Sequence, residues 1–206
     1  MYRYAAQYVK DWEEFLKIRE TLPKAEVDQY PWNCGFQPKT YAQMAWNEAG
    51  LFLYMRAYEK NPRMVEERDN GDIYMDSCLE FFLNPCPNEV FFCNFEVNPK
   101  GFMYLASGPE ALDDRTLEDR SVFDNFELTA SVSAEYWDVC YRVPVAYFQK
   151  FNPNFSLSAE KILQANFYKC GDGTPIPHYG CWSPITSGEE TPNFYHVCDF
   201  GEIILK

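Results

Sequence analysis

Two strand-length runs between Asp72 and Gly101 alternate apolar and polar residues with a period of two. Successive side chains of a β-strand point to opposite faces, so each alternating set belongs to one face. The apolar set predicts a core face: Ile73, Met75, Leu79, Phe81, Leu83, Phe91, Cys93, Phe95 and Val97. The opposite set consists of acids, amides and a tyrosine: Tyr74, Asp76, Glu80, Asn94, Glu96 and Asn98. Hydrogen-bonding groups beside an aromatic ring suit a polyhydroxylated ligand.

Further strand-like runs follow along the chain. The predicted strands are Thr40–Glu48, Leu51–Glu59, Ile73–Leu83, Glu89–Asn98, Phe102–Ala106, Phe126–Ser133, Tyr136–Val143, Ile162–Cys170, Tyr179–Ser183 and Glu202–Leu205. Turn signals rich in Gly, Pro and Asn separate them. No helical run is long enough to cross between parallel strands, so mostly antiparallel pairing is expected. The sequence therefore predicts an all-β fold, an antiparallel β-sandwich.

A short helix is expected ahead of these strands. Trp12, Phe15 and Leu16 lie at helical spacing after Asp11, a residue type that caps helix N-termini. The first 31 residues are therefore interpreted as a helix and a lead-in that pack on the sandwich. The length of the chain fits a single domain spanning residues 1–206.

Composition and charge narrow the classes of partner. A formal charge of −13, with only 18 Lys and Arg, argues against nucleic acid, because phosphate binding needs clustered basic residues. No apolar run approaches the roughly 20 residues of a membrane helix, so no membrane partner is expected. The N-terminus lacks the features of a secretory signal, which indicates a cytoplasmic protein unless export information is missing from this sequence.

The cysteine and histidine pattern favours free thiols. The eight cysteines include no CxxC pair, and several fall inside strand-like runs. The two histidines, His178 and His196, lack ligand spacing to each other or to a cysteine pair. Partly buried, free cysteines are therefore expected, and a zinc site is not.

Other predicted strands also carry aromatic and polar residues opposite an apolar face. The period of two places Arg142, Asn166 and Tyr168 on such a face. If these strands share one sheet with Glu80 and Glu96, the common face can stack sugar rings on aromatics and hydrogen-bond their hydroxyls. The alternative is an ordinary solvent-facing sheet surface with weak Glu–Arg pairs, and periodicity alone leaves both open.

Four segments resemble, in order, the carbohydrate-binding modules of family 9 and their DOMON-like relatives: DIYMDSCLEFFLNP, FFCNFEVN, NFYKCGDGTPIPHYGCWSPI and PNFYHVCDFGEIIL. The likeness spans from about Trp32 to the C-terminus. It implies a jelly-roll or immunoglobulin-like sandwich that grips the terminal sugar of a glycan between two aromatic side chains. By position these are Tyr74, six residues before Glu80, and Phe194, six residues before Phe200. Both family positions are typically tryptophan.

Two further positions depart from the family pattern. The resemblance implies an arginine where this chain has Glu96, and a glutamine where it has Tyr168. Glu80 and Glu96 are then expected to approach each other, and two neighbouring carboxylates cannot both ionise cheaply without a cation. Compensation is expected from Arg142, Arg56, a metal ion or a basic ligand.

Trp182 and His178 are secondary site candidates. The resemblance places Trp182 on a late strand, where a core position is more common, and His178 is either a ligand contact or a loop anchor. Some relatives bind structural calcium through loop acids. Two acidic clusters leave room for calcium, although solvated surface is the simpler explanation: Glu66, Glu67, Asp69 and Asp72, and Asp113, Asp114, Glu118 and Asp119.

Three other function classes remain open beside the leading one. Glu80 and Glu96 could act as the acid and base of a glycoside hydrolase, whose carboxyl groups lie about 5–10 Å apart. The haem-binding DOMON-like branch needs axial Met or His ligands, but Met55 and Met75 occupy core-facing positions. A sandwich used only for protein contacts through exposed tyrosines is the third. The leading interpretation is a non-catalytic protein that binds a mono- or oligosaccharide, with a separate glycoside hydrolase as an expected companion.

Overall fold

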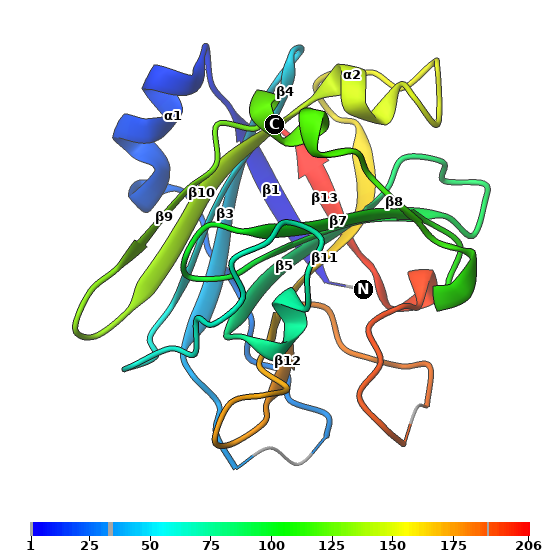
Figure 1. Ribbon diagram of the computed structural model, residues 1–206. Helices are drawn as coiled ribbons and strands as arrows, with labels where there is room; N and C mark the ends of the chain where they lie inside the picture. The colour runs from blue at the N-terminus through cyan, green and yellow to red at the C-terminus, as the bar shows by residue number, and fades with distance from the viewer. Residues whose placement is uncertain (1, 33–34, 189) are drawn as a thin grey trace.

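Thirteen strands form one continuous, curled sheet in the computed structural model, which describes residues 2–32, 35–188 and 190–206 (Figure 1). The strands are β1 (Arg3–Tyr8), β2 (Ala25–Glu26), β3 (Thr40–Asn47), β4 (Gly50–Ala57), β5 (Cys78–Asn84), β6 (Phe92–Val97), β7 (Met103–Gly108), β8 (Thr116–Leu117), β9 (Thr129–Val132), β10 (Trp137–Pro144), β11 (Ile162–Cys170), β12 (Tyr179–Cys181) and β13 (Gly201–Leu205). The helices are α1 (Trp12–Ile18) and α2 (Val145–Phe148), with 3-10 turns η1 (Arg19–Thr21), η2 (Ile73–Met75), η3 (Leu112–Asp114), η4 (Arg120–Asn125) and η5 (Val197–Asp199).

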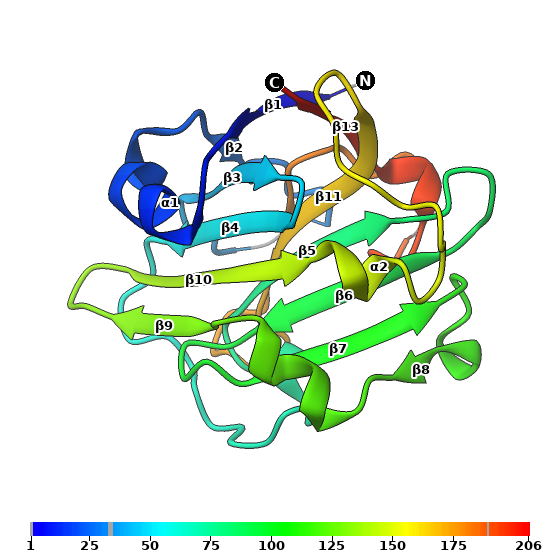
Figure 2. The ribbon, with the colours of Figure 1, turned by 90° about the horizontal axis from the view of Figure 1, so that it is seen from above.

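The sheet curls so that its two halves face each other (Figure 2). One half runs β8-β7-β6-β5-β11-β13 and the other β3-β4-β10-β9, while β12 pairs with β11 and β2 with β3. Strand β1 joins the halves, because Arg3–Ala6 pairs with β13 and Gln7–Tyr8 pairs with β3, both in parallel. All other strand pairs are antiparallel, which confirms the predicted mostly antiparallel, β-rich fold.

Strand β1 corrects the prediction for the first 31 residues. They were expected to form a helix and a lead-in that pack on the sheet. The helix is confirmed, since α1 begins after Asp11, whose side chain accepts a hydrogen bond from the Glu14 N–H. Residues Arg3–Tyr8, however, are a strand of the sheet itself, with Tyr4 and Ala6 buried in its core.

Aromatic side chains fill the space between the two halves. The Phe95 ring of β6 lies 5.9 Å from that of Phe81, 6.4 Å from that of Tyr141 in β10 and 6.3 Å from that of Phe148 in α2. The predicted core face of β5 and β6 is therefore confirmed over Leu79–Leu83 and Cys93–Val97, at alternating positions. This burial fixes which residues of the same strands point outward.

Two different covers lie on the outer faces of the sheet. Helix α1 lies on the outer side of β3, β4 and β10 (Figure 1). Its Phe15 ring packs against Phe52 there. The outer side of β5, β6 and β11 is partly covered by the C-terminal segment, through Phe194 and Phe200. Only this second side carries Glu80 and Glu96.

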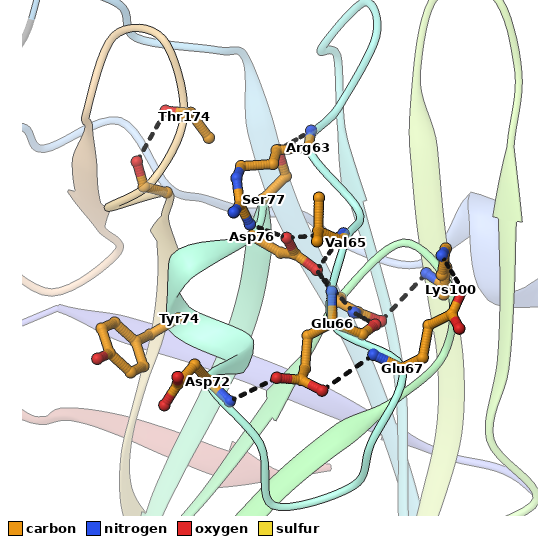
Figure 3. A network of polar contacts seen from close by, with 12 residues as sticks. Arg63, Val65, Glu66, Glu67, Asp72, Tyr74, Asp76, Ser77, Lys100 and Thr174 are labelled. Carbon is orange, nitrogen blue, oxygen red and sulfur yellow. Dashed lines mark hydrogen bonds and ion pairs between the residues drawn. The ribbon is translucent and has the colours of Figure 1, made fainter.

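The predicted strand Ile73–Leu83 begins later than its alternation suggested. Its first residues form the turn η2, and β5 starts at Cys78. The reason is Asp76, whose fully buried carboxylate accepts the N–H groups of Val65 and Glu66 at 2.9 Å (Figure 3).

Two side chains complete this anchor. Asn98 donates to the Asp76 carboxylate at 3.0 Å, and Arg63 forms an ion pair with it. The Asp76 network thus folds the segment before β5 back on itself and holds Tyr74 on a turn above the sheet.

Replacing Phe95 by alanine should lower the free energy of unfolding by about 3–5 kcal/mol, because a fully buried aromatic ring leaves a cavity between the two halves. Urea denaturation measures the loss. Ile162→Ala, at a half-exposed position of β11, is the control and should cost less than about 1 kcal/mol. Equal losses for the two variants would contradict the core described above.

Asp76→Asn should destabilise the protein by about 1–3 kcal/mol, because both carboxylate oxygens accept hydrogen bonds and an amide turns one of them into a donor. Hydrogen exchange should accelerate at the Val65 and Glu66 amides. The control is Glu67→Gln, which removes an exposed ion pair with Lys100 and should change little. Unchanged protection at Val65 and Glu66 would refute the anchoring role.

Candidate functional site

An open cavity of about 800 Å³ lies over the outer face of β5, β6 and β11, and we refer to it as the cleft. Side chains from strands far apart in the sequence line it, together with η2, η3 and the C-terminal segment. Its acidic lining residues are Glu80, Glu96, Glu110, Asp113 and Asp172. Its aromatic lining residues are Tyr74, Tyr104, Tyr179, Phe194 and Tyr195. The cleft therefore combines ring surfaces with hydrogen-bond acceptors.

Glu80 and Glu96 form the floor of the cleft. They are direct partners in the register between β5 and β6, and cross-strand partners have Cβ atoms about 4.5–5.5 Å apart. Both are almost fully buried, with exposed fractions of 3% and 4%. Glu96 accepts hydrogen bonds from Asn94 at 2.7 Å and from the Tyr195 hydroxyl at 3.1 Å. Glu80 has a different environment, since the thiols of Cys78 and Cys170 lie within 4.8 Å of its carboxyl group and the Cys170 thiol donates to the Tyr74 main-chain oxygen at 3.7 Å.

Burial makes both carboxyl groups reluctant to ionise. Burial, followed by the charge of Glu96, raises the pKa of Glu80 well above its usual value. Burial raises the pKa of Glu96 to about 7, although its hydrogen bonds from Asn94 and Tyr195 oppose the change. At neutral pH the floor is therefore poised between its neutral and its ionised forms.

The charge of Arg115 lowers the pKa of Glu96, but the Arg115 side chain binds other groups. Arg115 donates to the Asn94 side chain at 2.6 Å and to main-chain oxygens of Phe92, Gly108 and Pro109. Its guanidinium also lies 3.8 Å from the centre of the Phe92 ring. Among the described residues that line the cleft, none is Lys, Arg or His.

The two predicted stacking residues both line the cleft but offer different surfaces. Tyr74 is 45% exposed on its turn, so a ring face is open to a ligand. Phe194 is only 7% exposed, because it stacks on Tyr168 at a centroid distance of 4.2 Å and packs against Trp32 at 5.7 Å. Phe194 therefore presents little more than an edge to the cleft.

Asn166 and Tyr168 lie on the same outer face as Glu80 but are covered by the C-terminal segment. Tyr168 is the register partner of Glu80, yet it is fully buried beneath Phe194. The Asn166 amide donates to the main-chain oxygens of Ser183 and Asp199, which fastens that segment to β11. The alternation placed both residues on the correct face but could not show this cover.

The predicted shared face for the glutamates and the arginines is wrong. Arg56 and Arg142 belong to β4 and β10, in the opposite half of the sheet, and point away from the core on the far side. Arg56 pairs with Asp138 at 2.9 Å and Arg142 with Glu127 at 2.7 Å. Neither arginine can compensate the charges of the cleft.

Trp182 and His178 also lie outside the cleft lining. Trp182 is a core residue packed on Phe167. His178 is fully buried, with its Nε2 atom 2.6 Å from the Lys169 ammonium, and burial followed by Lys169 lowers its pKa to about 4. Lys169 pairs in turn with Glu59 at 3.2 Å, so His178 anchors a buried polar cluster.

One group of side chains has metal-binding geometry within the described part of the chain. Ligand atoms of Cys78, Glu80 and Cys170 lie within 4.8 Å of one another below the cleft. Burial raises the pKa of the Cys78 thiol to about 12, so both thiols are protonated unless a metal displaces the protons. The seven described cysteines are free, as predicted, while Cys34 falls outside the described residues.

The two acidic clusters considered for calcium mostly have protein partners. Glu66 accepts from Arg68 and from nearby main-chain N–H groups, while Glu118 pairs with Lys150. Asp119 accepts from Ser121. Structural calcium at these loops stays a prediction.

Several lining residues escaped the sequence analysis. Tyr104 pairs with Glu96 across β6 and β7, and Cys170 continues the period of two from Tyr168. Both could have been found by extending the alternation to neighbouring strands. Tyr195 and Asp172 lie on loops, whose placement no periodicity reveals.

Comparisons with known proteins agree on the fold. A protein from Bacteroides uniformis, proposed to bind carbohydrate, is 25% identical, with a TM-score of 0.87 over 99% of both chains. A family 9 carbohydrate-binding module from Caldicellulosiruptor kristjanssonii, solved with glucose, is 15% identical, with a TM-score of 0.68 over 100% of this chain and 96% of that one. The same module with cellotriose gives the same identity and TM-score, covering 94% of its chain.

A search of curated proteins found no match. Among the described residues, no helix is both long and apolar enough to cross a membrane. The model of carbohydrate-binding family 9 matches residues 12–205, almost the whole length of the sequence. The chain therefore belongs to carbohydrate-binding family 9.

Proposed function

We propose that this protein binds the end of a mono- or oligosaccharide in the cleft without chemically changing it. Tyr74 provides a ring face for stacking, and Glu80 and Glu96 bind hydroxyl groups from the floor. The observation that carries the proposal is this pair of buried carboxyl groups beneath an exposed tyrosine, in a cavity of about 800 Å³. Pockets for small ligands typically measure about 300–1,000 Å³.

The form of the floor favours binding over hydrolysis. In glycoside hydrolases the two carboxyl groups flank the bond that is broken. Glu80 and Glu96 are neighbours on one sheet surface, so a sugar above them meets both from the same side. Membership of a carbohydrate-binding family supports the same conclusion. A glycoside hydrolase that works beside this protein remains part of the proposal.

The haem alternative lacks its ligands at the cleft. Met55 and Met103 lie in the core between the two halves of the sheet, on the side away from the cleft. His178 is engaged by Lys169, and His196 is engaged by Glu110, with its Nδ1 atom 3.5 Å from the carboxyl group. We also propose that the curled sheet is a DOMON-like sandwich, because the single core shared by its two halves supports that architecture.

Tyr74→Ala should weaken saccharide binding about 2- to 10-fold, because an aromatic stacking contact contributes about 0.5–1.5 kcal/mol. A glycan array that includes glucose and cello-oligosaccharides identifies the ligand, and calorimetry gives the dissociation constants. Tyr58→Ala is the matched control, since Tyr58 is 38% exposed and lies beyond the end of β4, in the other half. Equal affinities for wild type and Tyr74→Ala would remove Tyr74 from the site.

Stability should fall as the pH rises from about 4.5 to above 7. The pKa of Glu96 is raised from its unfolded value of 4.5 to about 7, so the folded state binds more protons in this window. Stabilisation by the protonated form is present at low pH and is lost as Glu96 ionises. Glu96→Gln should flatten this part of a melting-temperature profile relative to wild type. Identical pH profiles would show that Glu96 ionises normally.

A further inference from the structure

We propose that the cleft selects a saccharide end bearing a protonated amino group, such as a free hexosamine, over neutral and acidic sugars. This inference rests on the proposed function and specifies its ligand class. The chemistry recognised is an ammonium group attached to a sugar ring, with hydroxyl groups beside it. Three observations support it. The lining is acidic, the buried Glu80 carboxyl group has only weak hydrogen-bond partners among the described residues, and the nearby basic residues bind other groups.

The lining of the cleft is acidic throughout. Carboxyl groups come from the floor at Glu80 and Glu96 and from the rim at Glu110, Asp113 and Asp172. None of the described lining residues is basic. A uronic acid or a sulfated sugar would therefore meet no lysine or arginine in the lining, whereas an ammonium group is attracted to its carboxyl groups.

The surroundings of Glu80 are the second, independent observation that favours a cationic ligand. The Glu80 side chain is nine-tenths buried or more and faces the cleft. Among the described residues, the thiols of Cys78 and Cys170 lie within 4.8 Å of its carboxyl group, and the Cys170 thiol donates to the Tyr74 main-chain oxygen at 3.7 Å. Thiols are weak donors. A buried carboxyl group normally has stronger partners.

Two other buried carboxylates, those of Asp76 and Glu59, show the usual arrangement. Asp76 accepts main-chain N–H groups and pairs with Arg63. Glu59 accepts from Ser77 at 2.7 Å and from Trp137 at 3.1 Å, and pairs with Lys169. Glu80 is the exception among these three. Because it lies on the floor of the cleft, a bound ligand can supply its missing partner.

The nearby bases are held by other groups, and His196 has its Nδ1 atom 3.5 Å from Glu110 at the rim instead of at the floor. Lys169 is on the core side of β11 and is bound to Glu59 and His178. Arg115 is held by the Asn94 side chain and main-chain oxygens beside Phe92. An ammonium group carries three donors on one atom, enough to reach Glu80 and Glu96 together, while a hydroxyl group donates once.

The test compares three sugars of the same ring size at neutral pH by calorimetry on the intact chain: glucosamine, N-acetylglucosamine and glucose. Each titration is run at 0.15 M and 1 M salt, with and without a chelator. Glucosamine should bind at least about tenfold more tightly than the other two, because a charge-assisted hydrogen bond exceeds a neutral one by about that factor. Its advantage should shrink at 1 M salt, where charges are screened within about 3 Å.

Two variants locate the effect. Glu80→Gln keeps the shape of the side chain but cannot ionise beside a bound ammonium group, so the preference for glucosamine over glucose should fall to about twofold or less. Glu135→Gln is the matched control, because Glu135 is exposed and pairs with Lys60 on the other half of the sheet. It should keep the wild-type preference. A thermal melt of each variant confirms that it is folded, and the salt series on wild type does not depend on either variant.

The outcomes separate this inference from the proposed function. Glucose binding as tightly as glucosamine, or a preference unchanged in Glu80→Gln, overturns the amine selectivity and leaves saccharide binding intact. If all three sugars bind equally and the chelator abolishes their binding, a metal ion supplies the neutralising charge. This result also overturns the amine selectivity. If no saccharide on the array or in the titrations binds, the proposed function fails together with this inference.

Discussion

The register between β5 and β6 determines both faces of this protein at once. Pairing Phe81 with Phe95 places their rings in the core, and the same register pairs Glu80 with Glu96 on the outer face. A slip of either strand by one residue would drive its glutamate into the aromatic core, so the register is strongly specified. The core thereby supplies the rigidity that holds two mutually repelling carboxyl groups side by side. The strain of that repulsion is what makes the floor ready for a polar or cationic partner.

The remaining elements shape the space above this floor. The Asp76 network folds the segment before β5 into a turn and raises Tyr74 over one side of the cleft. The C-terminal segment closes the other side, fastened by Asn166 and by the stacking of Phe194 on Tyr168. The cleft is therefore built from three parts of the chain that only the folded sheet brings together. Its acidity follows from the same geometry, because the local bases pair with other groups.

Local alternation was enough to predict most of the strands, the core face of β5 and β6, and the floor. Glu80 and Glu96 were found because a period of two is a property of each strand alone. The sequence did not reveal β1, since RYAAQY carries only Tyr4 and Ala6 as buried residues and its parallel partners are distant in sequence. Arg142 was grouped with the glutamates because periodicity cannot tell which half of a curled sheet a strand joins.

The sequence also could not show which strand residues are covered by loops. Asn166 and Tyr168 face the correct side, but residues 17 to 33 positions further along the chain hide them. Trp182 and His178 lie in aromatic, loop-rich sequence that resembles a site, and their partners Phe167 and Lys169 are known only from the fold. The departures from the family pattern at Glu96 and Tyr168 were visible in the sequence, whereas their consequences depend on tertiary contacts.

The central claim is that a saccharide binds on the floor formed by Glu80 and Glu96. An amide NMR titration of the intact, isotope-labelled chain with glucosamine and glucose tests it most directly. The account predicts that the largest shift changes cluster at Tyr74, Glu80, Glu96 and Tyr195, the residues that line the cleft. Shift changes centred instead on the groove beside α1, at Leu16, Arg19 and Ser131, would contradict it, as would a spectrum that neither sugar alters.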